Sequence, residues 1–339
     1  MTKKVNFGII GAGRIGTVHA EGISTRIATA DVLAISDISL EAAQLCASRF
    51  GIPLATRNHR DLLENPAIDA VVICSSTDTH TQFICEAAEA GKHIFCEKPI
   101  ALDLPAIDKA LATVARCSVK LQIGFNRRFD SNFRHIQETV AAGKIGTPHL
   151  VRITSRDPAP PPISYIKVSG GIFLDMTIHD FDMARYLIGG EVTELYAAGG
   201  VLVDPAIGEA GDIDTAVITL RYTNGAIGII DNSRKAVYGY DQRAEVFGSA
   251  GSIESQNKTP YNTICSTAAG VQGVNPLYFF LERYMDSYAA EMRAFIDCIQ
   301  NDAPSPVSGL DGRIPVVMGL AAWKSYREQR PVKLSEVAG

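Results

Sequence analysis

The residues with the clearest chemical potential are a lysine, an aspartate and a histidine. Lys98 stands in the segment CEKP at 96–99, and Asp175 and His179 are four residues apart. On a helix that spacing places the carboxylate and the imidazole on one face. An imidazole can take a proton near neutral pH, a carboxylate can orient it, and an ammonium can stabilise a developing alkoxide. The three types together suit removal of a hydroxyl proton while an alcohol is oxidised.

Each of these residues also has a plainer interpretation when it is taken alone. Lys98 could be a solvated surface lysine, and Asp175 with His179 could be an ordinary helical pair. With Asp180 and Asp182 nearby, the pair could bind a metal, but no second histidine or cysteine joins it. We therefore expect no metal site.

A glycine-rich turn at 11–16, GAGRIG, indicates the partner of such chemistry. It stands between an expected strand and an expected helix, which is the context that gives this motif its meaning. Glycines let the backbone approach a pyrophosphate, and the helix N-terminus offers unpaired N–H groups. A tight turn without a ligand is the alternative. The expected dinucleotide contacts of this turn are Gly11, Gly13, Arg14, Ile15 and Gly16.

The second expected strand ends at Asp37, where a carboxylate would accept hydrogen bonds from the adenosine ribose. The same charge would repel a 2′-phosphate about 4 Å away by roughly 1 kcal/mol in water-like surroundings, and by more at lower dielectric. Ile38 offers no compensating charge, although Arg14 could. The sequence therefore favours NAD over NADP, and the alternative is that Asp37 is only a turn residue.

The first 125 residues alternate short apolar runs with helical stretches. Nearly continuous hydrophobicity, instead of strict alternation, is typical of strands that are buried on both faces of a parallel sheet. The expected strands are Val5–Ile10, Val32–Ser36, Leu54–Thr56, Ala70–Cys74, His93–Cys96 and Leu121–Phe125. Strands and helices in series predict a doubly wound α/β sheet, a Rossmann fold.

Beyond residue 125 the pattern changes to a helix at Phe129–Ala142, a strand at His149–Ser155 and a helix near Asp175–Ile188. The rest reads mainly as strands without long crossovers, which predicts an α+β domain with a large, mostly antiparallel sheet, open on one face. The expected strands are Val192–Val203, Asp214–Tyr222, Ala226–Ser233, Gln242–Phe247 and Ser252–Ser255, with a hairpin at Asn224-Gly225. Helices at Leu277–Gln300 and Asp311–Arg327 complete the chain.

Length and composition agree with two folded domains. The chain has 339 residues, 46% of them hydrophobic, and a net charge of −5, against roughly 150 residues for one domain. The acidic balance argues against nucleic acid or an anionic membrane as a main partner. Seven cysteines without a C-x-x-C pair indicate reduced thiols in a cytoplasmic protein. The sequence contains no run of about 18 apolar residues, so we expect no membrane-spanning helix.

Taken together, the motifs resemble the glucose-fructose oxidoreductase/inositol dehydrogenase family over essentially the whole length. The residues that carry the resemblance are GAGRIG at 11–16, CEKP at 96–99, GFNRRFD at 124–130, SRDP at 155–158, GGIFLDMTIHDFDMARYL at 170–187 and YGYDQR at 238–243. The resemblance implies NAD-dependent oxidation of a ring hydroxyl of a cyclic polyol, most simply myo-inositol to 2-keto-myo-inositol. It also implies a homotetramer formed through the second domain's sheet.

The same resemblance assigns roles to individual residues. Lys98, Asp175 and His179 match the family's catalytic positions, and the bond between Lys98 and Pro99 is expected to be cis. The remaining expected cofactor contacts are Ser75, Ser76, His80 and Glu97, and Lys98 is among them as well. The expected substrate contacts are Asn126, Arg127, Asp157 and Tyr240. We place the NAD-binding domain at residues 1–123 and the substrate-binding and oligomerisation domain at 124–339.

Structural roles remain open for several of these residues. Arg127 could be an interdomain ion-pair partner, Asp157 a turn acid before Pro158, and His80 a histidine that only begins a helix. Tyr238 is almost as good a pocket tyrosine as Tyr240.

Two other functions also remain open. The chain could act on scyllo-inositol, chiro-inositol or an aldose, because only pocket geometry separates these substrates. It could also be a NAD-sensing regulatory protein, which would need no Lys/Asp/His set.

Overall fold

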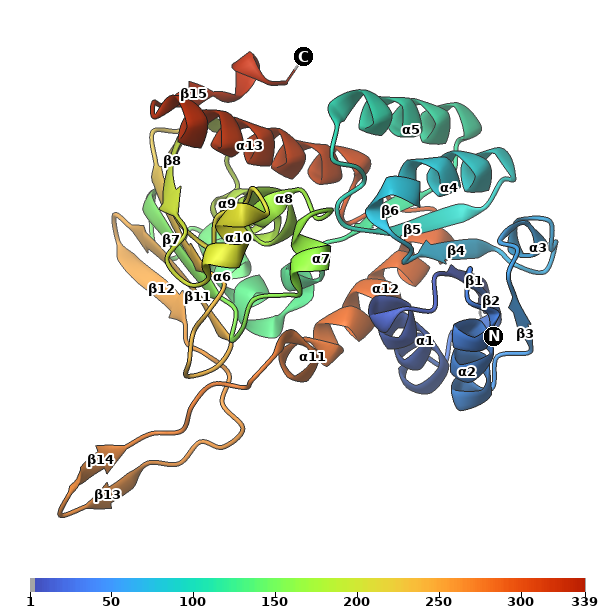
Figure 1. Cartoon of the computed structure of the whole chain (residues 1–339), viewed down its shortest axis with the longest axis horizontal. Helices are drawn as coiled ribbons and strands as arrows, with labels where there is room; N and C mark the ends of the chain where they lie inside the picture. The colour runs from blue at the N-terminus through green and yellow to red at the C-terminus, as the bar shows by residue number, and fades with distance from the viewer. Residues whose placement is uncertain (1–3, 339) are drawn as a thin grey trace. The chain divides into compact units, whose positions relative to one another are not determined.

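A computed structural model describes residues 4–338 and divides the chain into two compact units (Figure 1). The first unit comprises Met1–Phe129 and Met285–Val316, and the second comprises Asp130–Tyr284 and Val317–Gly339. Helix α12 (Met285–Gln300) joins the first unit because it packs on α1 (Arg14–Arg26). The prediction gave each domain one continuous range, 1–123 and 124–339, whereas the contacts return this late segment to the first unit.

The first unit is built on a six-stranded parallel sheet in the order β3-β2-β1-β4-β5-β6, which confirms the doubly wound prediction. Its apolar runs are almost entirely buried, as expected for a sheet covered on both faces. The strands are β1 (Val5–Ile10), β2 (Ala30–Ser36), β3 (Leu54–Thr56), β4 (Ala70–Ile73), β5 (His93–Glu97) and β6 (Leu121–Gly124).

The helices of this sheet begin and end at the signals that the sequence carries. The side chains of Ser39 and Asp103 accept hydrogen bonds at the starts of their helices, and Gly51 ends one in the left-handed conformation. The helices are α2 (Leu40–Phe50), α3 (Arg60–Leu63), α4 (Thr77–Glu89) and α5 (Leu104–Cys117), followed by the 3₁₀ turn η1 (Asn126–Phe129).

The second unit contains a seven-stranded sheet in the order β12-β11-β7-β10-β9-β8-β15. Only the β7–β10 pair is parallel, so the sheet is mixed and mostly antiparallel, as predicted. The strands are β7 (Pro148–Arg156), β8 (Val192–Gly200), β9 (Thr215–Tyr222), β10 (Ile227–Ser233), β11 (Asp241–Gly248), β12 (Gly251–Ser255) and β15 (Val332–Lys333).

Alternation along these strands shows that the sheet has one buried and one exposed face. In β9 every second side chain is buried, and α9 (Thr177–Ile188) packs on β7 and β10. The other face exposes Val217, Ile227 and Phe247, as the open-faced prediction requires. The hairpin at Asn224-Gly225 is confirmed: it joins β9 to β10, with a φ of +85° at the glycine.

The structure corrects three predicted helices. The expected helix Phe129–Ala142 is η1 followed by α6 (Ser131–Ala141), because the Asp130 side chain caps α6. The expected helix Asp175–Ile188 is divided at Met176 into α8 (Gly171–Asp175) and α9. The expected helix Leu277–Gln300 is α11 (Phe280–Arg283) and α12, which Tyr284 separates.

Several elements were not predicted at all. They are α3, α7 (Ile163–Ile166), α10 (Pro205–Glu209), β15, the 3₁₀ turn η2 (Leu334–Glu336), and a hairpin of β13 (Cys265–Thr267) with β14 (Gly270–Gln272) that projects from the sheet in Figure 1. All of them are two to five residues long, too short to carry a periodic pattern. Helix α13 (Gly309–Glu328) lies close to its predicted range.

Candidate active site

The glycine turn of the first unit has the shape that a pyrophosphate requires. Gly11 has a φ of +104°, and a Cβ there would lie 2.7 Å from the backbone of Cys74. A Cβ on Gly16 would lie 1.9 Å from the carbonyl oxygen of Gly11, whereas Gly13 has open space around it. Gly13 is the N-cap of α1 and no side chain caps that end. Arg14 and the half-buried Ile15 follow as its first helical residues, so the N–H groups there remain available to an anion.

Asp37 lies directly beside this turn. Its Oδ2 accepts a hydrogen bond from the backbone N–H of Ala12 at 2.7 Å, and its Oδ1 accepts one from that of Ser39 at 2.8 Å. A carboxylate oxygen can accept more than one hydrogen bond, so the carboxylate is held in place and can still receive ribose hydroxyls. The residues present therefore fit a dinucleotide, and the neighbouring Ile38, 94% exposed, brings no cation for a 2′-phosphate.

His80 connects the two loops that follow β4 and β5. Its Nδ1 lies 2.8 Å from the carbonyl oxygen of Pro99, and its Nε2 lies 3.1 Å from that of Ser75. Burial lowers the pKa of His80, although both carbonyl contacts oppose that shift. The peptide bond between Lys98 and Pro99 is cis, as the resemblance implied. His80 thus links the loop of Ser75 and Ser76 to the turn that carries Lys98.

Glu97, the residue before Lys98, belongs to a buried group that the sequence did not indicate. His19 Nε2 lies 2.7 Å from Glu97 Oε1, and Glu291 of α12 is wholly buried, with no hydrogen-bond partner for either carboxylate oxygen. One ligand atom from each of these three residues lies within 4.8 Å of the others. Burial, and then the charge of Glu97, raises the pKa of Glu291 well above its usual range, which favours the neutral form of this acid.

Asn126 and Arg127 begin the 3₁₀ turn η1 at the end of β6, and both are buried. The side-chain nitrogen of Asn126 has no hydrogen-bond partner within the protein. A buried amide N–H without a partner is costly, so this group is a candidate donor to a ligand. The structure thus places the predicted Asn126 and Arg127 in the first unit.

In the second unit, Asp175 ends α8 and His179 lies in the first turn of α9. Met176 keeps right-handed helical angles, and its N–H donates to the carbonyl of Ile172 at 3.0 Å. The chain therefore keeps a right-handed helical conformation across the break, and the four-residue spacing of Asp175 and His179 favours side chains on one side of it. Asp180, weighed above as a metal ligand, accepts a hydrogen bond from Asn232 at 2.9 Å inside the unit.

A buried arginine lies beside Asp175. Arg234, which follows β10, donates to Asp175 Oδ2 and to Asp212 Oδ2, each at 3.2 Å. Burial lowers its pKa, but Asp175, Asp212 and the predicted substrate residue Asp157 outweigh burial and hold the pKa above its ordinary value. The guanidinium is therefore a permanent cation within a group of three carboxylates.

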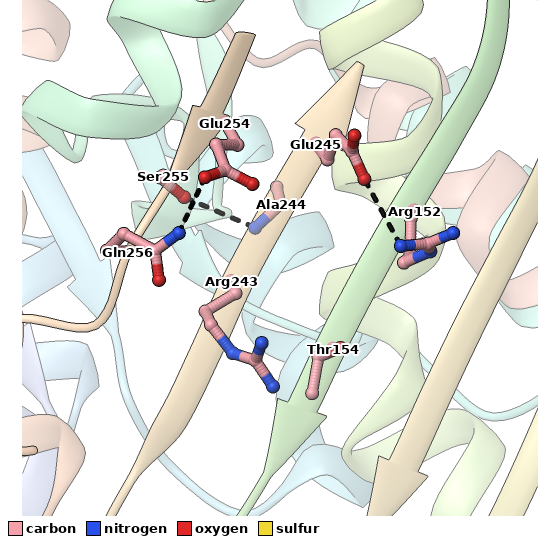
Figure 2. Close-up of a pocket in the computed structure, with 8 residues that line it drawn as sticks. All are labelled: Arg152, Thr154, Arg243, Ala244, Glu245, Glu254, Ser255 and Gln256. Atoms are coloured by element: carbon pink, nitrogen blue, oxygen red, sulfur yellow. Dashed lines mark hydrogen bonds and ion pairs between the residues drawn. The ribbon is translucent and has the colours of Figure 1, made fainter. Parts of the chain in front are cut away.

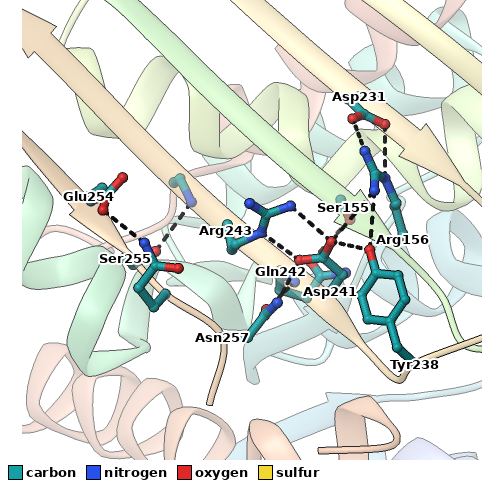
Figure 3. Close-up of polar contacts among 12 residues, drawn as sticks. Ser155, Arg156, Asp231, Tyr238, Asp241, Gln242, Arg243, Glu254, Ser255 and Asn257 are labelled. Atoms are coloured by element: carbon teal, nitrogen blue, oxygen red, sulfur yellow. Dashed lines mark hydrogen bonds and ion pairs between the residues drawn. The ribbon is translucent and has the colours of Figure 1, made fainter. Parts of the chain in front are cut away.

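The two candidate pocket tyrosines lie in different surroundings. Tyr240 is buried, and its ring packs against those of Phe279 and Tyr284 at 6.2 and 6.0 Å. Tyr238 donates to Asp241 at 2.6 Å and accepts from Arg156 at 3.1 Å, within the network of polar contacts that Figure 3 shows. The hydroxyl of Tyr238 thus belongs to an ionic network on the sheet, and the ring of Tyr240 belongs to an aromatic cluster, so Tyr240 as the pocket tyrosine stays a prediction.

The same sheet carries a polar hollow that contains none of the predicted site residues. Figure 2 shows it over β7, β11 and β12, with the ion pair of Arg152 and Glu245 at one side. Its lining residues are Arg152, Thr154, Arg243, Ala244, Glu245, Glu254, Ser255 and Gln256. Most of these polar groups are exposed or already paired, so nothing in the hollow resembles a site for chemistry.

Comparison with known proteins decides the family. The model described as "Oxidoreductase family, NAD-binding Rossmann fold" matches residues 5–125, and that described as "GFO/IDH/MocA C-terminal domain" matches residues 133–254. The chain belongs to the GFO/IDH/MocA oxidoreductase family. It is an NAD-dependent oxidoreductase, as the sequence predicted.

Individual members of the GFO/IDH/MocA family match over their full length. A myo-inositol 2-dehydrogenase of Thermotoga maritima is 52% identical, with 99% of this chain and 100% of the relative covered. An inositol 2-dehydrogenase of Rhizobium meliloti is 46% identical, with 98% and 99% covered. The solved scyllo-inositol dehydrogenase of Lactobacillus casei with bound NAD(H) and scyllo-inositol has a TM-score of 0.91 at 31% identity, with 98% and 100% covered.

Sequence reasoning missed four polar residues of these clusters. Glu291 is one of several polar residues in its helix, and the sequence does not distinguish it from the others. Arg234, Asp212 and Tyr165 belong to short or irregular segments. A single signal was present for Arg234, a charged residue at the end of an apolar strand.

Residues 4–338 contain no helix with the length and hydrophobicity that crossing a bilayer requires.

Proposed function

We propose that this protein oxidises one ring hydroxyl of a cyclic polyol, with myo-inositol as substrate and 2-keto-myo-inositol as product. The observation that carries the proposal is the full-length similarity to two inositol 2-dehydrogenases, one of them 52% identical. The glycine turn and Asp37 support NAD as the partner. An aspartate at the end of α8 and a histidine in the first turn of α9, four residues apart, support a proton-accepting site in the second unit.

In the proposed reaction, His179 accepts the proton of the reacting hydroxyl and Asp175 stabilises the imidazolium that results. Lys98 donates a hydrogen bond to the same oxygen and offsets its developing charge. Bound NAD supplies the acceptor for the hydride. Asn126, Arg127, Asp157 and Tyr240 offer hydrogen bonds to the other ring hydroxyls and so fix which carbon reacts.

A second candidate substrate is scyllo-inositol, because a scyllo-inositol dehydrogenase shares this fold at 31% identity. The two inositols differ in the orientation of one hydroxyl, which a few polar contacts must distinguish. Within the family, other polyols and aldoses follow the same chemistry. A NAD-sensing regulator, by contrast, would not need the Lys/Asp/His set.

We further propose that residues 1–123 belong to the NAD-binding domain and that residues 124–339 form the substrate-binding and oligomerisation domain, except for the parts of that range that group with the first unit, which are residues 124–129 and Met285–Val316. The exposed apolar side chains on the open sheet face, Val217, Ile227 and Phe247, support a homotetramer formed through that face. Seven unpaired cysteines support a reducing, cytoplasmic location.

The test is NAD reduction by the purified protein with a panel of inositol isomers and pyranoses. We expect the highest kcat/KM with myo-inositol, and the absence of turnover with every polyol and sugar would reject the proposal. Lys98→Met should lower kcat by about 10²–10³-fold while NADH binding, measured by fluorescence, stays within about twofold. Lys109→Met, at an exposed lysine on α5, is the matched control and should change neither quantity.

A further inference from the structure

The buried arginine of the second unit lies at the point where the proposed proton acceptor is held. Arg234 is 1% exposed, and its two terminal nitrogens contact Asp175 and Asp212. We propose that Arg234 is a positioning residue of the reaction, which fixes the carboxylate of Asp175 and, through it, the imidazole of His179. This inference rests on the proposed function, because it gives Arg234 a part in that reaction.

The contacts of Arg234 hold both ends of the short helix α8. One arm of the guanidinium reaches Asp175, the last residue of the helix. The other arm reaches Asp212, whose second oxygen accepts the backbone N–H of Ile172 at 2.9 Å in the first turn. A five-residue helix has little stability of its own. The guanidinium and Asp212 therefore determine where α8 lies and where its terminal carboxylate stands.

The carboxylate of Asp175 is held from two sides. Arg234 donates to Oδ2, and the hydroxyl of Tyr165 donates to Oδ1 at 2.8 Å. Two donors on two different oxygens fix the plane of the carboxylate as well as its position. An aspartate held in this way can orient a neighbouring imidazole more accurately than one that rotates freely.

The backbone carries this placement from Asp175 to His179. Met176 bonds back to Ile172, and the N–H of His179 donates to the carbonyl of Met176 at 3.3 Å. The start of α9 is therefore attached to α8 without a flexible loop. A displacement of Asp175 would therefore also displace His179, because the backbone between them is short and hydrogen-bonded. The four-residue spacing, which favours neighbouring side chains, would add to this effect.

Charge gives Arg234 a second effect. Asp157, Asp175 and Asp212 all interact with this cation, and it offsets part of the field that they exert on a proton nearby. Without it, the uncompensated carboxylates would hold a proton on His179 more strongly. A base that is already protonated cannot accept the substrate proton, so the cation keeps His179 available at neutral pH.

The experiment compares Arg234→Gln with Arg234→Lys in the full chain. In Arg234→Gln we expect kcat to fall by about 10²-fold and NADH binding, measured by fluorescence, to stay within about twofold. The acidic limb of the kcat–pH profile should move to higher pH. Arg234→Lys keeps the positive charge but cannot donate to Asp175 and Asp212 in the same two-armed geometry. The acidic limb of its kcat–pH profile should therefore stay near that of the wild type. Arg185→Gln on α9, which removes a partly buried ion pair with Glu191, is the matched control and should alter only thermal stability.

Histidine titration by NMR, without substrate or cofactor, decides the inference separately from the proposed function. The signal of His179, assigned with His179→Gln, should titrate at higher pH in Arg234→Gln than in the wild type. If Arg234→Gln fails to fold, Asp212→Asn replaces it. This change removes a negative charge and leaves the guanidinium in place, so the His179 signal should titrate at lower pH than in the wild type. An unchanged titration in a folded variant would overturn the inference even if the enzyme oxidises inositol. An inactive wild type with the expected titration shift would reject the proposed function alone.

Discussion

Two buried groups of charged side chains, one in each unit, are compensated in opposite ways. In the first unit, Glu291 is wholly buried near Glu97 and neither of its side-chain oxygens has a hydrogen-bond donor, so its raised pKa favours the protonated form. In the second unit, Asp175 and Asp212 share the guanidinium of Arg234. A buried carboxylate needs a positive partner, and a proton or a guanidinium can serve. The first group should therefore change with pH through Glu291, whereas the second contains a guanidinium whose pKa is raised further.

That difference matches the two proposed roles. A carboxylate that stabilises an imidazolium must be ionised, and Arg234 supplies a permanent positive charge beside the carboxylate of Asp175. The first group contains no such cation: its donor is His19, which lies 2.7 Å from Glu97. This group therefore supports the packing between α1, β5 and α12.

The largest effect should come from removing one carboxylate of the second group. Asp212→Ala leaves Arg234 with a single partner and removes the acceptor of the Ile172 N–H, so unfolding by urea should show a loss of about 3–5 kcal/mol. Glu138→Ala removes an exposed pair with Arg134 and should cost less than about 0.5 kcal/mol. Equal losses in the two variants would mean that the buried guanidinium contributes no more than a surface charge.

A smaller effect of opposite sign should come from the first group. The pKa of Glu291 is raised above its ordinary 4.5, so above pH 4.5 the folded chain keeps a proton that the unfolded chain releases. The free energy of unfolding therefore falls as the pH rises above about 4.5. Glu291→Gln has nearly the same shape and no charge. It should be more stable than the wild type by about 1–3 kcal/mol near pH 8, with a smaller gap near pH 5.

Thermal unfolding at several pH values measures the stability difference between Glu291→Gln and the wild type. Glu89→Gln, which removes an exposed ion pair with Arg116, is the control and should leave the stability unchanged. A lower stability of Glu291→Gln at every pH would contradict this expectation, because it would mean that the carboxyl group makes a stabilising contact that an amide cannot make.

The smallest effect concerns His80, which has carbonyl oxygens at both ring nitrogens. Burial lowers its pKa from 6.5 despite these contacts, so the folded chain resists a proton that the unfolded chain accepts. Stability from this residue is therefore present above about pH 6.5 and is lost as pH falls. His80→Gln should lose less stability than the wild type between about pH 7.5 and pH 5.5, by up to about 1 kcal/mol. Calorimetry measures the difference, and the exposed His135→Gln should follow the wild type.

Much of the fold could be predicted because its signals are local. The buried strands, the caps at Ser39 and Asp103, the hairpin at Asn224-Gly225 and the glycine turn each depend on residues within one or two turns of chain. The candidate site was predictable to the same extent: Lys98, Asp175 and His179 stand in recognisable segments, and Asp37 ends a strand. Their roles remain predictions that the variants above test.

What only the tertiary structure decided is which charged groups meet. Nothing near Glu291 in the sequence indicates that α12 brings it to Glu97, and nothing near Arg234 indicates two carboxylates on either side of it. The break at Met176 and the packing of residues 285–316 with the first unit were likewise not indicated by the nearby sequence. Side-chain type and spacing determine local conformation within a few residues, whereas the cost of burying a charge depends on what other elements place beside it.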